Sequence, residues 1–128
     1  MQIYLASLLI TTHTKTMKGG QNFLPEELIL DVARRFRALG EPVRLRILRL
    51  LEAGELSVNE VAELLEAGQS NISRHLQALY DCDLVDRRRK GTTIYYFISD
   101  PMVNRLCTLV CENAFQQAHG RLKLLTKP

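Results

Sequence analysis

Residues 56–84 constrain the fold of this 128-residue chain more than any other stretch. Over residues 57–66, apolar side chains recur three and four positions apart, which predicts a helix. Ser57 and Glu60 have the spacing of a capping box, so we expect this helix to begin at Ser57. Ala67 and Gly68 interrupt the pattern, and Gly68 offers the backbone freedom that often ends a helix.

A second amphipathic segment begins near Gln69. Its apolar positions Ile72, Leu76 and Leu79 predict another helix, whose opposite face carries hydrogen-bonding side chains. These are Gln69, Ser70, Asn71, Ser73, Arg74 and Gln77. Two helices joined by a short turn, the second with a polar N-terminal half, place a recognition helix in the DNA major groove. An ordinary helical hairpin has the same periodicity, so the flanking sequence must decide.

The charges of the chain are unevenly distributed. The net charge is only +3, but the basic residues form local clusters, which suit nucleic acid. The clusters are Arg34, Arg35 and Arg37; Arg44, Arg46 and Arg49; and Arg74 with Arg87, Arg88, Arg89 and Lys90. Three cysteines, an odd number, without a secretory signal predict reduced thiols in a cytoplasmic protein.

The length predicts one domain with short extensions. We assign residues 1–23 to a flexible N-terminal extension, residues 24–120 to the DNA-binding and dimerisation domain, and residues 121–128 to a C-terminal tail. The apolar run over residues 3–10 is too short to span a membrane. Two interpretations of the extension stay open: translation that starts at Met17, or an arm that packs on a partner subunit.

Two further helices are expected before the helix-turn-helix, over residues 25–39 and 42–51. Pro25, Glu26 and Glu27 suit a first helical turn. Arg44, Arg46 and Arg49 lie on the second of these helices, where we expect them to form a solvated face or to contact phosphates. After the recognition helix, residues 84–98 predict a β-hairpin with a basic tip, Arg87 to Lys90, that reaches phosphates or the minor groove.

The last predicted helix starts at Pro101 with Asp100 as its N-cap. Its apolar face is broad and comprises Val103, Leu106, Cys107, Val110, Cys111, Ala114 and Ala118. Because the earlier helices should already supply the core, we interpret this face as a homodimer seam. The whole pattern predicts an α+β, mostly helical fold: a winged helix-turn-helix with a two-stranded β-hairpin wing and a C-terminal dimerisation helix.

The order ALGEPVRLRILRLL, ELSVNEVAELL, QSNISRHLQAL and LVDRRRKGTTIYYFIS closely resembles the ArsR/SmtB family of bacterial metal- and stress-sensing repressors, over roughly residues 25–118. The resemblance implies a cytoplasmic, homodimeric repressor that leaves double-stranded operator DNA when an inducer binds. Carried over by position, the DNA-facing residues are Gln69, Ser70, Asn71, Ser73 and Arg74, with wing contacts at Arg87, Arg88, Arg89 and Lys90. Gln and Asn can pair with adenine and Arg with guanine.

Other classes of protein fit less well. The chain has no glycine-rich phosphate loop, nucleophile elbow or histidine paired with acids at ligand spacing, so we predict that it is not an enzyme. A DNA-independent interaction module could use the hairpin and the seam. It would not need Ser70, Asn71 and Arg74 on one helix face.

Known inducer sites of the family are mostly missing. Residues 55–60, where the family has a thiol site, contain no cysteine, and neither do residues 45–51, where persulfide sensors carry one. The zinc-type site of the last helix would fall on Asp100, Met102, Asn113 and Gln116, of which only Asp100 is a suitable ligand. We therefore expect no zinc site of this type.

Three cysteines remain as candidates for sensing. Cys107 and Cys111 are four residues apart and share one helix face, and Cys82 follows the recognition helix. Thiolate ligands select trivalent arsenic or antimony, cadmium or Cu(I). No cofactor is required, and the predicted inducer is a soft thiophilic ion held by Cys107, Cys111 and Cys82. Family members that sense arsenite or antimonite with cysteines on this helix favour this interpretation. Thiol oxidation or persulfidation, or a purely structural role, are the alternatives.

Overall fold

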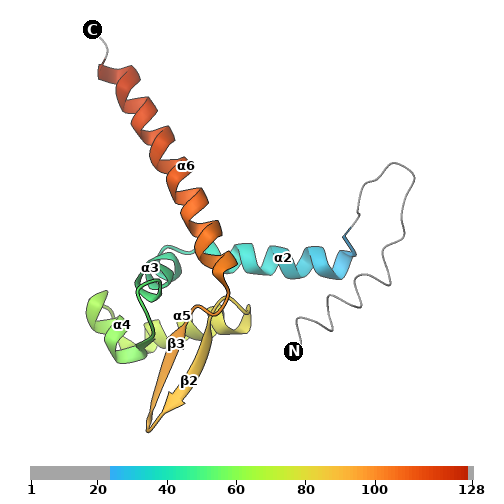
Figure 1. Cartoon of the computed structure of the whole chain (residues 1–128), viewed down its shortest axis with the longest axis vertical. Helices are drawn as coiled ribbons and strands as arrows, with labels where there is room; N and C mark the ends of the chain where they lie inside the picture. Colours follow the sequence, from blue (N-terminus) through green and yellow to red (C-terminus); the bar gives the residue numbers. More distant parts are fainter. Residues whose placement is uncertain (1–23, 127–128) are drawn as a thin grey trace. The chain divides into compact units, whose positions relative to one another are not determined.

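The computed structural model describes residues 24–126 (Figure 1). The predicted flexible extension over residues 1–23, with its two interpretations, therefore lies outside the described residues. The chain divides into two units, Met1–Arg37 and Ala38–Pro128, and each is described by itself. The elements are α2 (Glu26–Leu39), α3 (Pro42–Leu51), β1 (Leu56–Ser57), α4 (Val58–Leu64), α5 (Gln69–Asp81), β2 (Asp86–Lys90), β3 (Thr93–Phe97) and α6 (Pro101–Thr126).

Helix α2 begins where the sequence predicts, with Glu26 and Glu27 in its first turn. Asp31 forms ion pairs with Arg34 at 3.0 Å and with Arg35 at 2.7 Å, one helical turn away. Two arginines of the first basic cluster, Arg34 and Arg35, are therefore paired with an acidic residue of their own helix.

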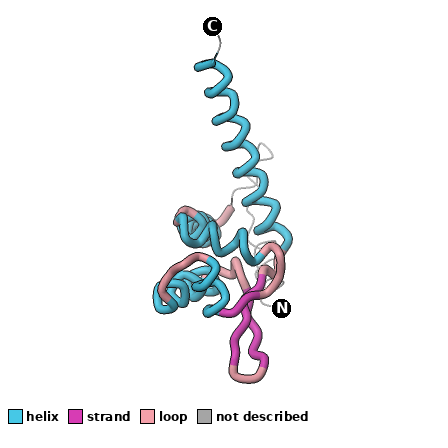
Figure 2. Tube along the Cα trace, turned by 90° about the vertical axis from the view of Figure 1, so that its left-hand side faces the viewer, coloured by secondary structure: helices cyan, strands magenta, loops and turns pink. Residues whose placement is uncertain are grey.

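The hydrophobic core of the second unit gathers side chains from α3, α4, α5, β3 and α6. Its fully buried members are Ile47, Leu48, Val61, Ile72, Leu76, Leu79 and Val103. The apolar positions of each helix face this core because they recur at helical spacing. Figure 2 shows the three helices α3, α4 and α5 gathered beside the hairpin. The predicted apolar face of the recognition helix is thus confirmed.

The start of α4 is capped as the sequence predicts. Oγ of Ser57 accepts a hydrogen bond from the Glu60 N–H at 3.2 Å, and Oε1 of Glu60 accepts one from the Ser57 N–H at 3.1 Å. The end of α4 differs from the expectation. Glu66, not Gly68, adopts positive φ, at 51°, while Gly68 has φ −69° and caps the start of α5.

The turn between α4 and α5 closes without help from a glycine. The Ala67 N–H donates to the Ala62 carbonyl at 2.9 Å and the Glu66 N–H donates to the Glu63 carbonyl at 3.2 Å. This paired pattern satisfies the last carbonyls of a helix and forces one residue into the left-handed region. Here that residue is a glutamate, which explains why the glycine signal is two residues too late.

The wing contains one strand more than the predicted hairpin. Strands β2 and β3 pair antiparallel, and β1 adds to β3 to give the order β1-β3-β2. Leu56 lies opposite Tyr96 and Ser57 opposite Tyr95. Gly91 has φ 66° in the turn between β2 and β3, which favours glycine there. A two-residue strand gives no periodicity, so the sequence did not reveal β1.

Helix α6 begins at Pro101, and Oδ1 of Asp100 accepts a hydrogen bond from the Met102 N–H at 2.9 Å, which confirms the predicted N-cap. Val103 and Cys107 are buried in the core. The expectation that earlier helices supply the core alone is therefore wrong: the first turns of α6 complete it. Residues 108–126 are all exposed, and the helix continues past residue 120 and extends beyond α3 and α5 (Figures 1 and 2).

Candidate nucleic-acid interface and thiol pair

The N-terminal half of α5 presents a polar surface. Gln69, Ser70, Ser73 and Arg74 are exposed and Asn71 is partly exposed, while Ile72 and Leu76 anchor the opposite face in the core. In the free protein, Nη2 of Arg74 donates to Oδ1 of Asn71 at 2.9 Å. Two side chains able to pair with bases therefore hold each other in place on one turn of the helix.

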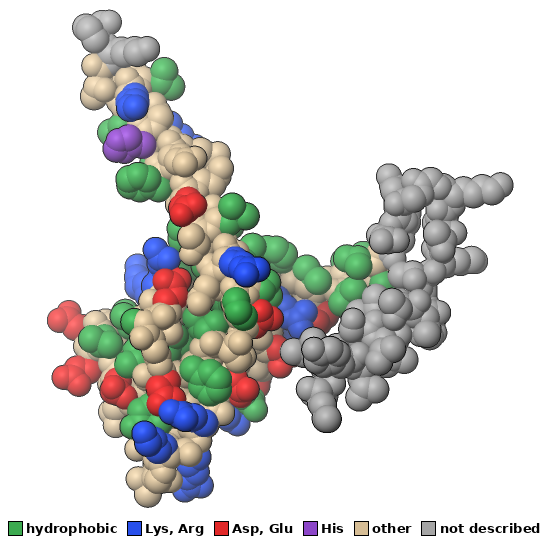
Figure 3. All heavy atoms as spheres, viewed as in Figure 1, with side chains coloured by type: hydrophobic (Ala, Val, Ile, Leu, Met, Phe, Trp, Pro, Cys, Tyr) green, Lys and Arg blue, Asp and Glu red, His purple; other side chains and the backbone are tan. Residues whose placement is uncertain are grey.

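The basic residues of the wing divide between the two faces of the hairpin. Arg87 pairs with Tyr96, Arg88 with Tyr95 and Arg89 with Ile94. Because side chains alternate along a strand, Arg87 and Arg89 share one face and Arg88 and Lys90 share the other. Figure 3 shows Lys and Arg side chains gathered over the hairpin.

Arg87 contacts the recognition helix. Its guanidinium carbon lies 4.0 Å from the centroid of the Tyr80 ring, and its Nη1 donates to Oε1 of Gln77 at 3.1 Å. Nε2 of Gln77 in turn donates to Oδ1 of Asp81 at 2.8 Å. A hydrogen bond with Tyr96 and the charges of Tyr96 and Tyr80 raise the pKa of Arg87, although desolvation opposes this.

Arg88 contacts the segment before β1 from the other face of the wing. Its Nε and Nη2 atoms donate to the two carboxylate oxygens of Glu55, which makes a bidentate pair. Hydrogen bonding to Arg88 lowers the pKa of Glu55, and the charge of Lys90 adds to this effect.

The remaining wing residue, Arg89, bonds only locally among the contacts described. Its Nε donates to the carbonyl of Gly91 at 3.1 Å, within the turn. All five residues of β2 are exposed. Arg89 and Lys90 thus present their charge at the tip of the wing.

Cys107 and Cys111 lie one turn apart on α6, and Cys82 is the residue that follows the last residue of α5. Cys107 and Cys82 are each 8 % exposed, whereas Cys111 is exposed. Burial raises the pKa of the Cys107 thiol, and the nearby Cys111 thiol and Glu52 carboxylate raise it further, while Arg49 lowers it. The two residues lie four positions apart on α6, the spacing from which the shared helix face was predicted.

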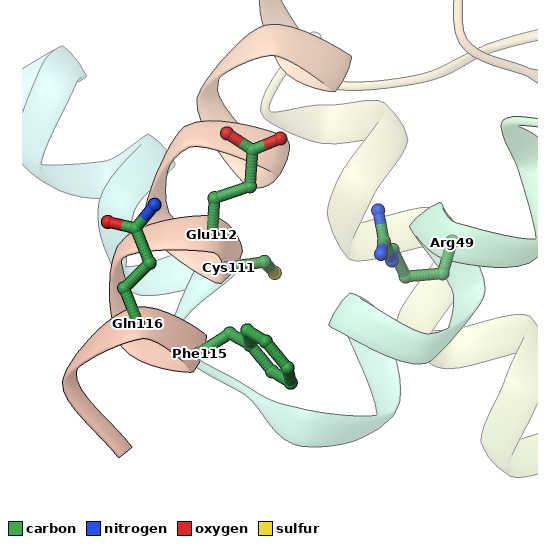
Figure 4. Close-up of a pocket in the computed structure, with 5 residues that line it drawn as sticks. All are labelled: Arg49, Cys111, Glu112, Phe115 and Gln116. Carbon is green, nitrogen blue, oxygen red and sulfur yellow. The ribbon is translucent and has the colours of Figure 1, made fainter. Parts of the chain in front are cut away.

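A shallow groove of about 540 Å³ runs beside Cys111. It is lined by Arg49 of α3 and by Cys111, Glu112, Phe115 and Gln116 of α6. In Figure 4, Cys111 and Phe115 point from α6 toward the side occupied by Arg49. Within residues 24–126, no three Cys, His, Asp or Glu side chains are grouped so that they could hold a metal ion. The described structure therefore does not gather Cys82 with the pair into a three-ligand cluster.

Several contacts of this surface could not be found from the sequence. Glu55 and Arg88 are 33 residues apart, and no local signal links them. Tyr80 and Gln77 lie one helical turn from each other, but their shared partner Arg87 is on a strand. The sequence placed Gln77 on the polar face of the helix, but it did not predict the contact of Gln77 with Arg87 of the wing.

Helices with a polar recognition surface beside a basic hairpin define a winged helix-turn-helix protein. Residues 41–87 match the family described as "Bacterial regulatory protein, arsR family". The chain is 37% identical over 81 residues to the arsenical resistance operon repressor of Bacillus subtilis, covering 62% of this chain and 77% of that one. The chain belongs to the ArsR family. The resemblance drawn from the sequence is thus confirmed, and the family is one of transcriptional regulators, not enzymes.

Two further comparisons agree. The chain is 40% identical over 77 residues to the probable mercury resistance operon repressor of Streptomyces lividans, covering 60% of this chain but only 62% of that repressor's length. The solution structure of the homodimeric winged helix-turn-helix DNA-binding domain of Mb0332 from Mycobacterium bovis has 37% identity and a TM-score of 0.72, covering 80% of this chain and 94% of that one. The predicted fold class is confirmed. No helix among the described residues is long and apolar enough to cross a membrane.

Proposed function

We propose that this protein is a homodimeric transcriptional repressor that binds double-stranded operator DNA. The observation that carries the proposal is the exposed polar face of α5, whose opposite face is fixed in the core. Gln69, Ser70, Asn71, Ser73 and Arg74 read the major groove from this face, and Arg87, Arg88, Arg89 and Lys90 belong to the wing beside it.

The second copy packs against α6. Leu109, Val110 and Phe115 are each more than half exposed, and Leu122, Leu124 and Leu125 continue the apolar side chains toward the helix end. Apolar surface of this extent on one helix marks an interaction site. The related Mb0332 domain, described as homodimeric, supports the same assembly here.

The proposed inducer is a soft thiophilic ion, such as arsenite, antimonite or cadmium, bound by Cys107 and Cys111. Two thiols one turn apart can hold one ion without distorting the helix. Thiolates favour such ions over harder ones. The relatives named as arsenical and mercury resistance repressors support this choice of ligand.

One chain offers the ion two thiols, and further ligands must come from elsewhere. Cys82, the third ligand predicted from the sequence, does not form a three-ligand cluster with the pair within the described residues of one chain, and a two-fold axis along α6 would instead bring four thiols together. Burial raises the pKa of Cys107 and Arg49 only partly offsets this, so an ion that binds there must displace the thiol proton. An ion bound on α6 would lie next to Arg49 of α3, and α3 packs with α5 in the same core. Binding could in this way shift the recognition helix.

An anaerobic titration of the reduced protein tests this function. Arsenite, antimonite, cadmium and zinc are added in turn and binding is followed by thiolate absorption, while fluorescence anisotropy follows release from DNA of the protein's own promoter region. We expect saturable binding of soft ions together with DNA release. Both should be lost in Cys107→Ser and in Cys111→Ser, whereas Cys82→Ser shows whether the third thiol takes part.

The same experiment separates the alternatives. DNA release by an oxidant or a persulfide donor, without ion binding, would indicate a redox-responsive repressor, which the exposed Cys111 thiol permits. Ion binding without DNA release would leave the cysteines as packing residues. Absence of salt-dependent duplex binding would refute the repressor itself.

A further inference from the structure

The four basic residues of the wing are not equivalent, although the sequence presents them as one run. Arg87 and Arg88 are each held by side chains from elsewhere in the fold, whereas the described contacts of Arg89 stay within the turn. The two held arginines lie at the base of β2, near the body, and Arg89 and Lys90 lie at the tip.

Arg87 is held by three groups at once. It stacks on Tyr80 of α5, donates to Gln77 of α5 and lies directly opposite Tyr96 in the hairpin. Tyr96 is 4 % exposed and Gln77 is itself fixed by Asp81, so these partners are anchored. A guanidinium that is stacked and hydrogen-bonded in this way is fixed in one orientation. These contacts link the wing to the recognition helix.

Arg88 links the other face of the wing to Glu55. Its bidentate pair with Glu55 joins β2 to the residue that precedes β1. The carboxylate that pairs with this guanidinium cancels its charge locally, so Arg88 attracts a phosphate less strongly than an unpaired arginine does. The two arginines therefore hold the hairpin from opposite faces.

From these contacts we propose that Arg87 and Arg88 are positioning residues that fix the angle of the wing against α5, and that Arg89 and Lys90 carry its contacts with phosphate. This inference rests on the proposed function and sharpens it. It revises the assignment of all four residues as equivalent DNA contacts.

Salt dependence of operator binding distinguishes the two roles. Each phosphate contact that is lost lowers the slope of log K against log salt concentration by about 1. Arg87→Lys keeps the charge but loses the planar stack, so we expect operator affinity to fall about tenfold with an unchanged slope. Lys90→Gln is the matched control, and we expect it to flatten the slope on specific and non-specific duplexes alike.

Variants of Tyr80 test the same contact without changing any charge. Tyr80→Phe keeps the ring under the guanidinium and should retain most of the affinity. Tyr80→Leu removes the ring and should reproduce the loss seen in Arg87→Lys. Amide exchange of β2 and β3 in the free, full-length protein should quicken in Tyr80→Leu, Arg87→Lys and Glu55→Gln, but not in Lys90→Gln.

The results can overturn the proposal without touching the proposed function. If Arg87→Lys binds like the unchanged protein while Arg87→Gln flattens the slope, Arg87 contacts phosphate and the proposal fails. Wing exchange that stays the same in both Arg87→Lys and Glu55→Gln would also refute it. If the unchanged protein binds no duplex, the proposed function fails and the inference falls with it.

Discussion

Nε of Arg44 donates a hydrogen bond to Nδ1 of His75 at 3.1 Å, which joins α3 to the recognition helix. The His75 side chain is 16 % exposed. Nη1 of Arg44 also reaches the carbonyl of Ala38 at 3.5 Å, and the Arg44 N–H donates to the N-cap carboxylate of Glu41 at 2.9 Å. From the sequence we expected Arg44 on a solvated face or in contact with phosphates. In the structure its side chain instead contacts other residues of the protein.

Replacement of Arg44 should lower stability. Arg44→Met keeps the aliphatic part of the side chain but leaves Nδ1 of His75 without its donor, so we expect a loss of about 1 kcal/mol in the free energy of unfolding. Urea denaturation measures the change. Arg46→Met, at an exposed position of the same helix, is the control and should stay within about 0.5 kcal/mol of the unchanged protein. Equal losses in the two variants would contradict a specific role for the bond to His75.

The capping box of α4 gives a second stability prediction. Ser57→Ala removes the acceptor for the Glu60 N–H at the start of the helix-turn-helix, and we expect a cost of about 1 kcal/mol. Thermal or urea unfolding would detect it. Asn59→Ala alters the next exposed position without touching the cap and should be close to neutral. A neutral Ser57→Ala would show that β1 pairing, rather than the cap, holds this residue.

The features predictable from the sequence are those whose signal is local. Ser57 and Glu60 are three residues apart, so their side chains and backbone groups meet as soon as the helix forms. The N-cap at Asp100 and the inward face of α5 follow for the same reason. The order of these local signals was also enough to indicate the family.

Features that depend on distant partners could not be predicted. The pair of Glu55 and Arg88 exists only because β1 joins the sheet beside β3. The broad apolar face of α6 could not be divided in advance between the chain's own core, which takes Val103 and Cys107, and surface that stays exposed. Helical periodicity predicts which side chains share one face of a helix, but it does not predict whether that face packs on the protein's own core or stays exposed.

Arg74 should contribute to the choice of operator sequence. Arg74→Ala removes a guanidinium able to pair bidentately with guanine, so we expect a loss of about 1–3 kcal/mol on the cognate operator and weaker discrimination against altered sites. Fluorescence anisotropy with cognate and scrambled duplexes measures both. Arg105→Ala, on an exposed position of α6, is the control. Unchanged affinity for the cognate duplex would remove Arg74 from base readout and leave its bond to Asn71 as its main role.

The two thiols of α6 should differ in reactivity although they lie one turn apart. Cys111 is exposed, whereas Cys107 is 8 % exposed and its pKa is raised, first by burial and then by Cys111. Because the thiolate is the reactive form, Cys107 should be alkylated more slowly than Cys111 at neutral pH, and its rate should level off at a higher pH than that of an ordinary thiol.

Iodoacetamide labelling followed by peptide mass spectrometry measures the two rates at a series of pH values. Labelling in urea is the control, because unfolding removes the burial and should make the rates similar. In Cys111→Ser the pKa of Cys107 should move down toward its ordinary value, since one of the groups that raise it is gone. Equal rates in the folded protein would mean that Cys107 is exposed to solvent, and the thiol pair would then be open from both positions to a soft ion.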